Sequence, residues 1–456
     1  MAEQRIKVAI VGGGIAGLAL AAGLAKLSHI DVHVYESVPE YKDIGAGLAL
    51  HLNAIKAMAL IGPELRQAYF DKALSMGEEN EEMVTQVILA QGPHSGQLVA
   101  ELGRAKGRKT VSRADLLAGF LELVPAACIS FGKKLVGIHE KPPPSHNDDH
   151  DHKVTLVFAD GTNAVADCLL GADGIHSPTR RHILGADHPA ATPKNHDGWQ
   201  IYRTLVSAEE ARKHIDAKWT TSVPILLGPR GHINCIPLSR NTRLSAGVAV
   251  RRGPSSAAAA LSPSSQTTPP PLDPSLYADY TPDAQRIVSL VALDPSASWS
   301  AADHDHAPSY IPLHPSTPPP RIAILGDAAH ASLPFAGNGA AQALEDAAVL
   351  YHLFARGVAS AAQIGSALIA YDAARRPRSQ RVVEVARRFG RVYAFAEEDG
   401  EGEGEGRKMM HEDPERMREF FAEMARFTNE FDVEGQNEEA LRVFGEVEGG
   451  ASGLRN

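Results

Sequence analysis

This 456-residue chain contains glycines and carboxylates at a fixed spacing that could bind a phosphorylated ligand. Gly12, Gly14 and Gly17 form the pattern G-x-G-x-x-G directly after the apolar run 8–11. In this pattern the glycines permit a tight turn, a close approach of backbone to pyrophosphate, and close packing of a helix on a strand. Glu36 follows Gly17 by 19 residues, where a carboxylate can accept hydrogen bonds from ribose hydroxyls. The two features predict a dinucleotide site, and a simple glycine turn is the alternative.

Two later turns also place a carboxylate after a short apolar run. Asp173 lies in the turn 171–174, and Asp327 follows Gly326. Ligands bind beyond the carboxyl ends of strands in open α/β sheets, so both carboxylates can reach sugar hydroxyls. A glycine-rich segment then precedes a long helical pattern and would present backbone N–H groups to an electron-rich ring edge; it comprises Gly337, Asn338, Gly339 and Ala340. Three such turns in this order make a chance occurrence improbable.

Strands and helices of an α/β fold must position these turns. Each turn follows a short apolar run and precedes a helical pattern, as in a Rossmann-like unit. Helical spacing also covers 53–61, and Ser112 is suited to cap a helix that begins at Arg113. Period-two patterning with Gly and Pro breaks in 199–250 predicts an antiparallel sheet. Mixed charge at helical spacing predicts a helical extension over 409–447.

Composition excludes several classes of protein. The chain is 44% hydrophobic and 22% charged, as in ordinary globular proteins, and its net charge of −10 argues against a nucleic-acid partner. Three distant cysteines argue against a disulfide framework and for a reducing compartment. The N-terminus runs directly into the first strand and no apolar run approaches the roughly 18 residues of a membrane span, so we expect a cytoplasmic protein without a membrane partner.

Four polar segments predict flexible loops: 142–152, 254–274, 315–320 and 397–405. Histidines and aspartates gather within the first of them, between 146 and 152. Nothing there would fix ligand geometry, so we interpret this run as a solvated loop rather than a metal site, and we predict no metal site in the chain.

Together the three turns resemble those of the single-component FAD-dependent aromatic hydroxylases, a flavoprotein monooxygenase family, and within it the salicylate hydroxylases. The resemblance extends from Ile6 to about Arg388, and its most specific parts are 171–177, 326–330 and the pair Glu345-Asp346. The segment 371–378 is similar to the helix that follows these motifs in the family. The resemblance implies FAD as cofactor and NADH or NADPH as transient co-substrate, since no second Rossmann unit is visible.

The resemblance implies a domain division and a set of cofactor contacts. The FAD-binding domain would comprise 1–72, 107–185 and 321–395, the interleaved antiparallel-sheet substrate domain 73–106 and 186–320, and a flexible loop with C-terminal helices 396–456. Gly12, Gly14 and Gly17 would hold the pyrophosphate, Glu36 the adenosine ribose, Asp327 the ribityl–pyrophosphate region, and 337–340 the flavin pyrimidine edge. Asp173 would help to position FAD and nicotinamide, and Ala49 and Arg113 would lie beside the flavin. Arg113 as a solvated first-turn residue is the alternative.

Candidate catalytic residues also come from the resemblance. His232 matches a histidine beside the substrate, and at a near-neutral pKa it could accept the proton of a phenol. Arg203 would orient flavin or substrate charge, and Pro334 would lie near the reactive face of the flavin. The structural alternatives are a hydrogen-bonded sheet histidine, a structural arginine and a helix-entry proline.

Two departures from related enzymes narrow these expectations. Ile236 stands where several related hydroxylases have a tyrosine, so a mechanism that needs that phenol does not transfer to this chain. Ala49 stands where 6-hydroxynicotinate hydroxylases have a histidine, which disfavours that substrate.

The resemblance implies an FAD-dependent, NAD(P)H-consuming monooxygenase that inserts oxygen from O2 into a phenolic acid. Salicylate is the first expectation, with loss of its carboxyl group to give catechol. One alternative is a larger phenolic or polyketide substrate, and another is a flavin-binding redox partner without hydroxylase turnover. The partners would be a small aromatic substrate and O2. The helix over 375–391 would either mediate a homodimer or be solvated.

Overall fold

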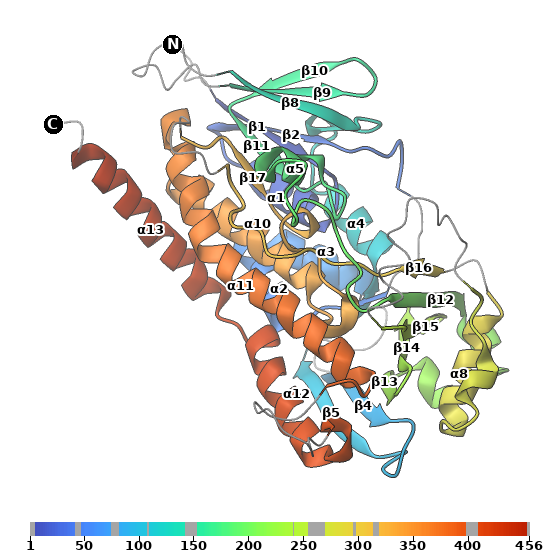
Figure 1. Cartoon of the computed structure of the whole chain (residues 1–456). Helices are drawn as coiled ribbons and strands as arrows, with labels where there is room; N and C mark the ends of the chain where they lie inside the picture. The colour runs from blue at the N-terminus through green and yellow to red at the C-terminus, as the bar shows by residue number, and fades with distance from the viewer. Residues whose placement is uncertain are drawn as a thin grey trace.

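The computed structural model describes residues 5–41, 47–73, 82–106, 109–141, 153–239, 241–253, 270–294, 298–312, 319–397 and 409–453. The loop predicted over 142–152, with its histidines and aspartates, lies outside the described residues, as do 254–269, 315–318 and 398–405 of the other three. The chain forms the predicted α/β fold (Figure 1).

A parallel five-stranded sheet with the order β17-β11-β1-β2-β7 carries the glycine turns. Its strands are β1 (Ile6–Val11), β2 (Ile30–Tyr35), β7 (Ile129–Ser130), β11 (Cys168–Gly171) and β17 (Ile322–Ile324). Side chains of β1 alternate between two cores, since Val8 and Ile10 pack on the helical side while Ala9 and Val11 pack on the opposite side. This double burial explains why the strand is apolar at nearly every position.

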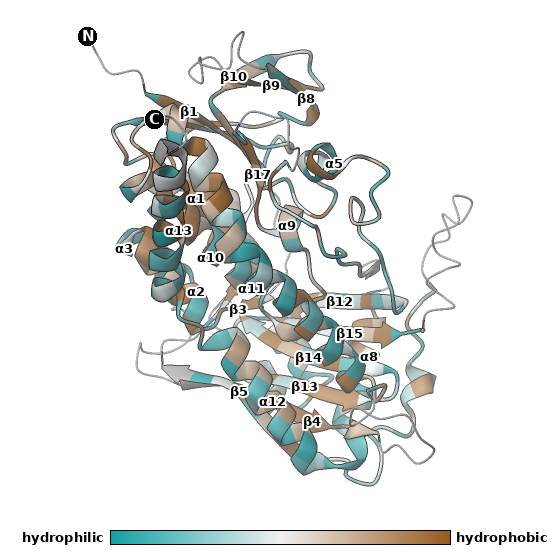
Figure 2. Cartoon of the chain, turned by 60° about the vertical axis from the view of Figure 1, so that its left-hand side comes forward, coloured by the Kyte–Doolittle hydropathy of each residue, from teal (hydrophilic) through white to brown (hydrophobic). Residues whose placement is uncertain are grey.

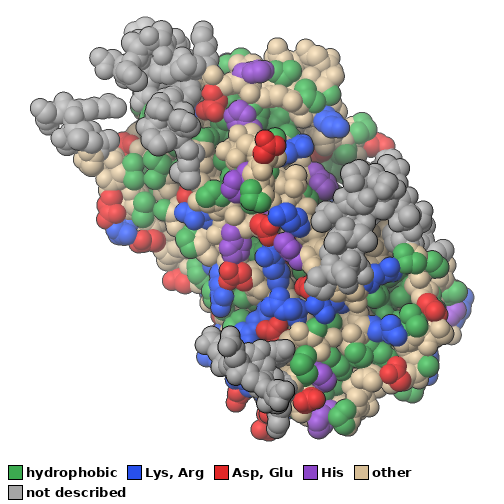
Figure 3. All heavy atoms as spheres, in the orientation of Figure 1, with side chains coloured by type: hydrophobic (Ala, Val, Ile, Leu, Met, Phe, Trp, Pro, Cys, Tyr) green, Lys and Arg blue, Asp and Glu red, His purple; other side chains and the backbone are tan. Residues whose placement is uncertain are grey.

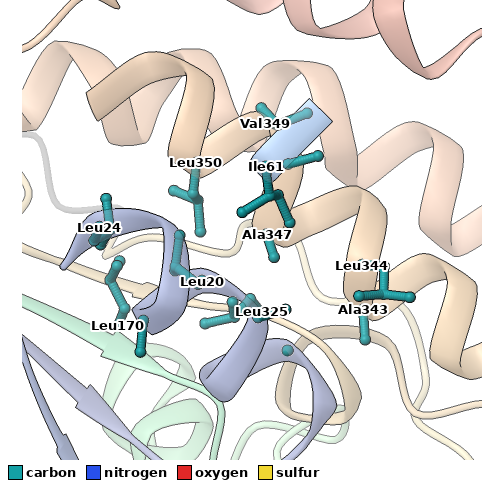
Figure 4. Close-up of a cluster of buried hydrophobic side chains, with 14 of the residues drawn as sticks. Leu20, Leu24, Ile61, Leu170, Leu325, Ala343, Leu344, Ala347, Val349 and Leu350 are labelled. Atoms are coloured by element: carbon teal, nitrogen blue, oxygen red, sulfur yellow. The ribbon is translucent and has the colours of Figure 1, made fainter. Parts of the chain in front are cut away.

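Helices cover one face of this sheet. They include α1 (Ile15–Leu24), α2 (Leu52–Ile61), α3 (Pro63–Ala73), α4 (Arg113–Leu121) and α10 (Gly339–Arg356). Figure 4 shows Leu20 and Leu24 of α1 packed between Leu170 of β11 and Leu350 of α10. The predicted cap of α4 is confirmed, because the Ser112 hydroxyl accepts a hydrogen bond from the Asp115 N–H at 2.9 Å.

A small antiparallel sheet covers the other face. It is formed by β8 (Leu135–Lys141), β9 (Lys153–Phe158) and β10 (Asn163–Ala166), and its Leu156 and Phe158 pack against Leu169 and Ile322 of the parallel sheet. A two-stranded pair, β3 (Gly47–Ala49) with β6 (Thr110–Ser112), lies beside the glycine turns.

The second large sheet has seven strands in the order β16-β12-β15-β14-β13-β4-β5. They are β4 (Glu82–Leu89), β5 (Leu98–Lys106), β12 (Trp199–Ser207), β13 (Val223–Gly228), β14 (Gly231–Leu238), β15 (Arg243–Arg251) and β16 (Ser298–Ser300). Every neighbouring pair is antiparallel, as expected, except β13 and β4, which run parallel. The long connection between β4 and β13 through the other sheet permits that direction.

Helices α6 (Ala208–Arg212) and α8 (Pro282–Ala292) cover one face of this sheet. The other face packs against α11 (Ile364–Tyr393) and α12 (Pro414–Asn429). The predicted C-terminal helices are present as α12 and α13 (Val433–Gly453), and α11 runs past both large sheets (Figure 1). In Figure 2 the parallel strands are mostly hydrophobic, whereas α11 and α13 also carry hydrophilic residues. The division into domains stays a prediction.

The inner face of α11 is buried within this chain, because it packs against α10 and α13 and its Arg375 is fully buried. The expectation of a helix that is simply solvated over 375–391 is therefore wrong for this face, and a homodimer stays a prediction.

Figure 3 shows basic, acidic and histidine side chains intermingled on one face of the molecule. Within the described part of the chain, no helix is long and apolar enough to cross a membrane, and no group of His, Cys, Asp and Glu is placed to hold a metal ion.

Candidate active site

A cavity of about 440 Å³ lies between the two large sheets. The beginnings of α1, α4 and α10 contribute Gly14, Arg113 and Gly339, and the seven-stranded sheet contributes Arg203 and His232. The predicted cofactor turns and the predicted substrate residues therefore share one space.

The first glycine turn has a shape that larger side chains would destroy. Gly12 has φ +103°, and a Cβ there would lie 2.2 Å from the Ala172 carbonyl oxygen; a Cβ on Gly17 would lie 2.0 Å from the Gly12 carbonyl oxygen. A Cβ on Gly14 would meet no described atom within 4 Å, and no described side chain caps the start of α1 at Gly14. This open helix N-terminus fits a pyrophosphate.

Glu36 braces the same turn. Its Oε2 accepts a hydrogen bond from the Gly13 N–H at 2.6 Å, and its Oε1 accepts from the Val38 N–H at 2.8 Å. The side chain lies at the end of β2 as predicted, but it does not line the 440 Å³ cavity. Its contact with ribose stays a prediction.

The two later carboxylates have different surroundings. Asp173 accepts hydrogen bonds from the Thr179 N–H at 3.0 Å, from the Thr179 hydroxyl at 2.7 Å and from the Ser177 hydroxyl, at the start of α5 (Pro178–Leu184). Its neighbours Ala172 and Gly174 line the cavity instead. Asp327 is exposed, lines the cavity and begins the short helix α9 (Asp327–His330).

Arg180 connects these two turns, a role that our sequence analysis missed. Its guanidinium is fully buried and donates to the Ala328 oxygen at 3.0 Å, the Ala329 oxygen at 2.6 Å and the Ala190 oxygen at 2.6 Å. An arginine just after the 171–177 motif was the available signal.

The start of α10 presents backbone to the cavity. Gly337 has φ +59°, and Asn338 cannot cap the helix because its side chain is engaged elsewhere. The Asn338 Nδ2 donates to the Asn429 Oδ1 at 3.0 Å, and its Oδ1 accepts from Gln342 at 3.0 Å and Asn53 at 3.2 Å. The first N–H groups of α10 therefore lie beside the cavity without this cap, as the predicted flavin contact requires. The lining residues of this segment are Gly337, Asn338, Gly339 and Ala340.

A fully buried charge cluster supports that helix from behind. Arg375 pairs with Glu345 at 2.6 Å and with Asp346 at 2.7 Å, and Asp346 also accepts from His330 at 2.6 Å and from the Gly326 N–H at 2.8 Å. Burial raises the pKa of each carboxyl, but the neighbouring cations outweigh it and lower both pKa values. The cluster ties the 326–330 turn to α10 and α11.

Alternation along β14 turns His232, Asn234 and Ile236 toward the cavity, while Ile233 and Cys235 enter the core on the other face. The His232 ring lies 5.1 Å from the ring of Phe335 and 5.1 Å from that of Tyr393. Burial lowers the His232 pKa to about 3. The expected near-neutral pKa is therefore wrong in this structure, and the imidazole is uncharged at neutral pH.

The remaining predicted residues also line the cavity. Arg203 has its guanidinium 4.9 Å from the Trp299 ring centre, and no carboxylate of the described chain forms an ion pair with it. Pro334 begins a 3₁₀ turn (Pro334–Ala336), so the helix-entry interpretation also applies to it. Ala49 lies on β3, and Arg113 is the first residue of α4.

Our sequence analysis missed the lining residues that come from distant helices. These are Phe389 and Tyr393 of α11 and Ala425, Thr428 and Asn429 of α12. The aromatic pair at spacing i, i+4 was a weak signal, since such pairs are common in any core.

These features define a flavoprotein with an aromatic substrate cavity, and comparison with known proteins gives the class. The sequence matches the family described as "FAD binding domain" over residues 5–386, and the chain belongs to this family. It is an FAD-dependent aromatic monooxygenase of the salicylate hydroxylase family.

Particular relatives support this assignment. The chain is 34% identical to 6-methylsalicylate 1-monooxygenase of Aspergillus terreus, over 98% of this chain and 94% of the relative. It is 32% identical to a salicylate hydroxylase of Pseudomonas putida, over 85% and 86% of the two chains. The solved structure described as a salicylate hydroxylase substrate complex is similar with a TM-score of 0.74 and 25% identity, covering 96% of this chain and 98% of that one.

Proposed function

We propose that the protein hydroxylates a phenol that carries an adjacent carboxylate, with salicylate as the first substrate and catechol and CO2 as products. One observation carries the proposal: the cavity beside the cofactor turns is lined by both a cation without a carboxylate partner, Arg203, and an uncharged imidazole, His232. A carboxylate and a phenol are the groups that complement this pair. The names of two similar enzymes, with salicylate and 6-methylsalicylate as substrates, support the same class.

FAD, when bound, would be reduced by NAD(P)H and would activate O2. The chain's own residues hold the substrate. Arg203 binds the carboxylate through its guanidinium. His232 accepts a hydrogen bond from the phenol at a ring nitrogen, which orients the hydroxyl and increases electron density on the ring. The apolar side chains of Ile225, Phe335 and Phe389 hold the ring and exclude water.

The cofactor contacts are part of this proposal. The pyrophosphate would lie on Gly12, Gly14 and Gly17, the flavin beside Ala49, Arg113 and Pro334, and its pyrimidine edge at 337–340. Asp327 would bind the ribityl chain. Asp173 would act indirectly, because its carboxylate already accepts hydrogen bonds from Thr179 and Ser177.

A substituted salicylate is the second candidate. The relative named for 6-methylsalicylate matches 98% of this chain, including the C-terminal helices, whereas the salicylate hydroxylase matches 85%. Methyl substitution is therefore a variable that the test must include.

The test is oxidation of NADH and of NADPH by the purified holoenzyme, with salicylate, 6-methylsalicylate and phenols that lack a carboxylate. We expect stimulated oxidation with one catechol formed for each NAD(P)H consumed. Peroxide without catechol, or equal rates with phenols that lack the carboxylate, would contradict the proposal. Hydroxylation of larger phenols only would favour a polyketide-type substrate, and bound FAD without oxidation by any phenol would favour a redox partner.

A further inference from the structure

Helix α12 forms part of the cavity wall although it lies outside residues 5–386, which match the family. It lies beside β5 at the end of the seven-stranded sheet (Figures 1 and 2). Its last two turns contribute Ala425, Thr428 and Asn429 to the lining. A segment beyond the matched region thus shapes the space for the substrate.

A buried cation fixes the end of this helix. Arg378 of α11 donates to the carbonyl oxygens of Phe427 at 2.9 Å and Thr428 at 3.1 Å, and it pairs with Glu345 of α10 at 3.3 Å. Its guanidinium also lies 4.7 Å from the ring centre of Phe427 and 4.0 Å from that of Phe431. The C-terminal turn of α12 is therefore joined to α10 and α11.

A second link reaches the predicted flavin edge. Asn429 accepts a hydrogen bond from Asn338, the residue that precedes the first turn of α10. With both links in place, α12 cannot move away from a larger ligand without breaking buried hydrogen bonds, which cost more to leave unmade than they contribute when formed.

Ala425 is the small residue of this wall. It is half-buried and packs against the apolar cluster that includes Phe335, Phe389 and Tyr393, the aromatic side of the cavity. A larger side chain would occupy cavity space beside these rings. A larger residue at 425 would therefore reduce the cavity space on its aromatic side.

We propose that α12 is a specificity wall and that Ala425 leaves the room for an alkyl substituent on the ring. This inference rests on the proposed function, since it assigns the substrate class of the same site. A fixed wall discriminates between ligands that differ by one methyl group by about 10-fold or more.

The test replaces Ala425 by Val and by Leu in the holoenzyme. We expect the ratio of kcat/KM for salicylate to kcat/KM for 6-methylsalicylate to rise with side-chain size, by about 10-fold in Ala425→Leu. The matched control is Ala422→Leu on the same helix, because Ala422 is exposed and lines a separate groove beside β5. This control should leave the ratio of kcat/KM values within about twofold of wild type, well below the roughly 10-fold change expected for Ala425→Leu.

Binding provides a readout without turnover. The flavin absorbance change reports dissociation constants for the probes benzoate and 2-methylbenzoate, and the Ala425 variants should weaken the second more than the first. The proposed role of Ala425 would be overturned if both Ala425 variants retained FAD and kept the wild-type ratio of kcat/KM values and of dissociation constants. It would also be overturned if Ala422→Leu changed these ratios as much as Ala425→Leu. If the Ala425 variants discriminate between the two benzoate probes but no salicylate is turned over, the proposed function is contradicted and the role of Ala425 stands. Absence of binding by every probe would overturn both.

Discussion

At the scale of single residues, the site is defined by polar groups that lack polar partners within the described part of the chain. A half-buried cation without a carboxylate carries a desolvation cost, and the contact of Arg203 with Trp299 offsets only part of that cost. His232 is buried among aromatic rings, and no described group pairs with its Nδ1. Both residues are therefore better explained by a ligand than by the stability of the sheet.

Arg203→Gln tests the carboxylate contact. Loss of a charge-assisted hydrogen bond costs about 1.5 to 3 kcal/mol, so we expect KM for salicylate to rise about 10- to 100-fold with FAD content unchanged. The control is Arg251→Gln in neighbouring strand β15, where Arg251 pairs with Asp197 at 2.8 Å and does not line the cavity. An equal rise in KM for phenols that lack a carboxylate would assign Arg203 to the flavin instead.

His232→Gln tests the contact with the phenol. We expect coupled catechol formation to fall about 10-fold, because one hydrogen bond between uncharged groups contributes about 0.5 to 1.5 kcal/mol, while FAD stays bound. Because burial lowers the His232 pKa to about 3, the pH profile of kcat/KM between pH 6 and 9 should keep its shape. An acidic limb near pH 6.5 that disappears in this variant would show that substrate binding restores the pKa. His214→Gln, at an exposed position, is the control.

At the scale of elements, buried ion pairs hold the helices that build the cofactor site. Glu345 and Asp346 come from α10 and Arg375 from α11, and all three side chains are 0% exposed. Removal of one partner from such a cluster leaves an uncompensated buried charge. The geometry of α10 at the cavity therefore depends on an arginine of another helix.

Arg375→Met should lower the free energy of unfolding by about 3 to 5 kcal/mol. Arg381→Met is the matched control on the same helix, because its pair with Glu384 is exposed and removal should cost about 1 kcal/mol or less. Urea unfolding of both variants, with FAD content measured in parallel, provides the comparison. Equal losses would show that the cluster contributes no more than a surface pair.

At the scale of the whole molecule, the cavity exists only where the two large sheets and the C-terminal helices meet. Burial keeps two histidines uncharged, His232 in the cavity wall and His304 outside it: it lowers the pKa of each to about 3, and for His304 the Arg180 charge adds to the effect. The unfolded chain binds protons at these histidines near pH 6.5. Between pH 3 and 6.5 the unfolded state thus holds more protons, and their contribution to stability falls as pH falls through this window.

His304→Gln should reduce this pH dependence. From a folded pKa of about 3 and an unfolded pKa of about 6.5, His304 accounts for about 2 kcal/mol of the stability lost between pH 7 and pH 5. Urea unfolding at the two pH values should show a smaller difference in the variant by that amount. His214→Gln should behave as wild type, and an unchanged difference in His304→Gln would contradict the assignment.

Local rules in the sequence determined the turns and the elements around them. Only glycine fits at 12 and 17, and the Ser112 hydroxyl caps α4 by accepting from the Asp115 N–H three residues later. Alternating patterns formed strands such as β14. All these features depend on residues that are near one another in the chain. They were sufficient to predict the α/β fold, and the family followed from the resemblance that the three turn motifs carry.

Tertiary structure decided what no local pattern contains. The pKa of His232 depends on rings from α11 and the 334–336 turn, the start of α10 depends on Asn429, and Asp173 is occupied by donors of α5. The wall at Ala425 comes from a helix nearly two hundred residues after β14. Burial and electrostatic pairing are properties of the packed chain, since they require groups that are distant in sequence to exclude water together.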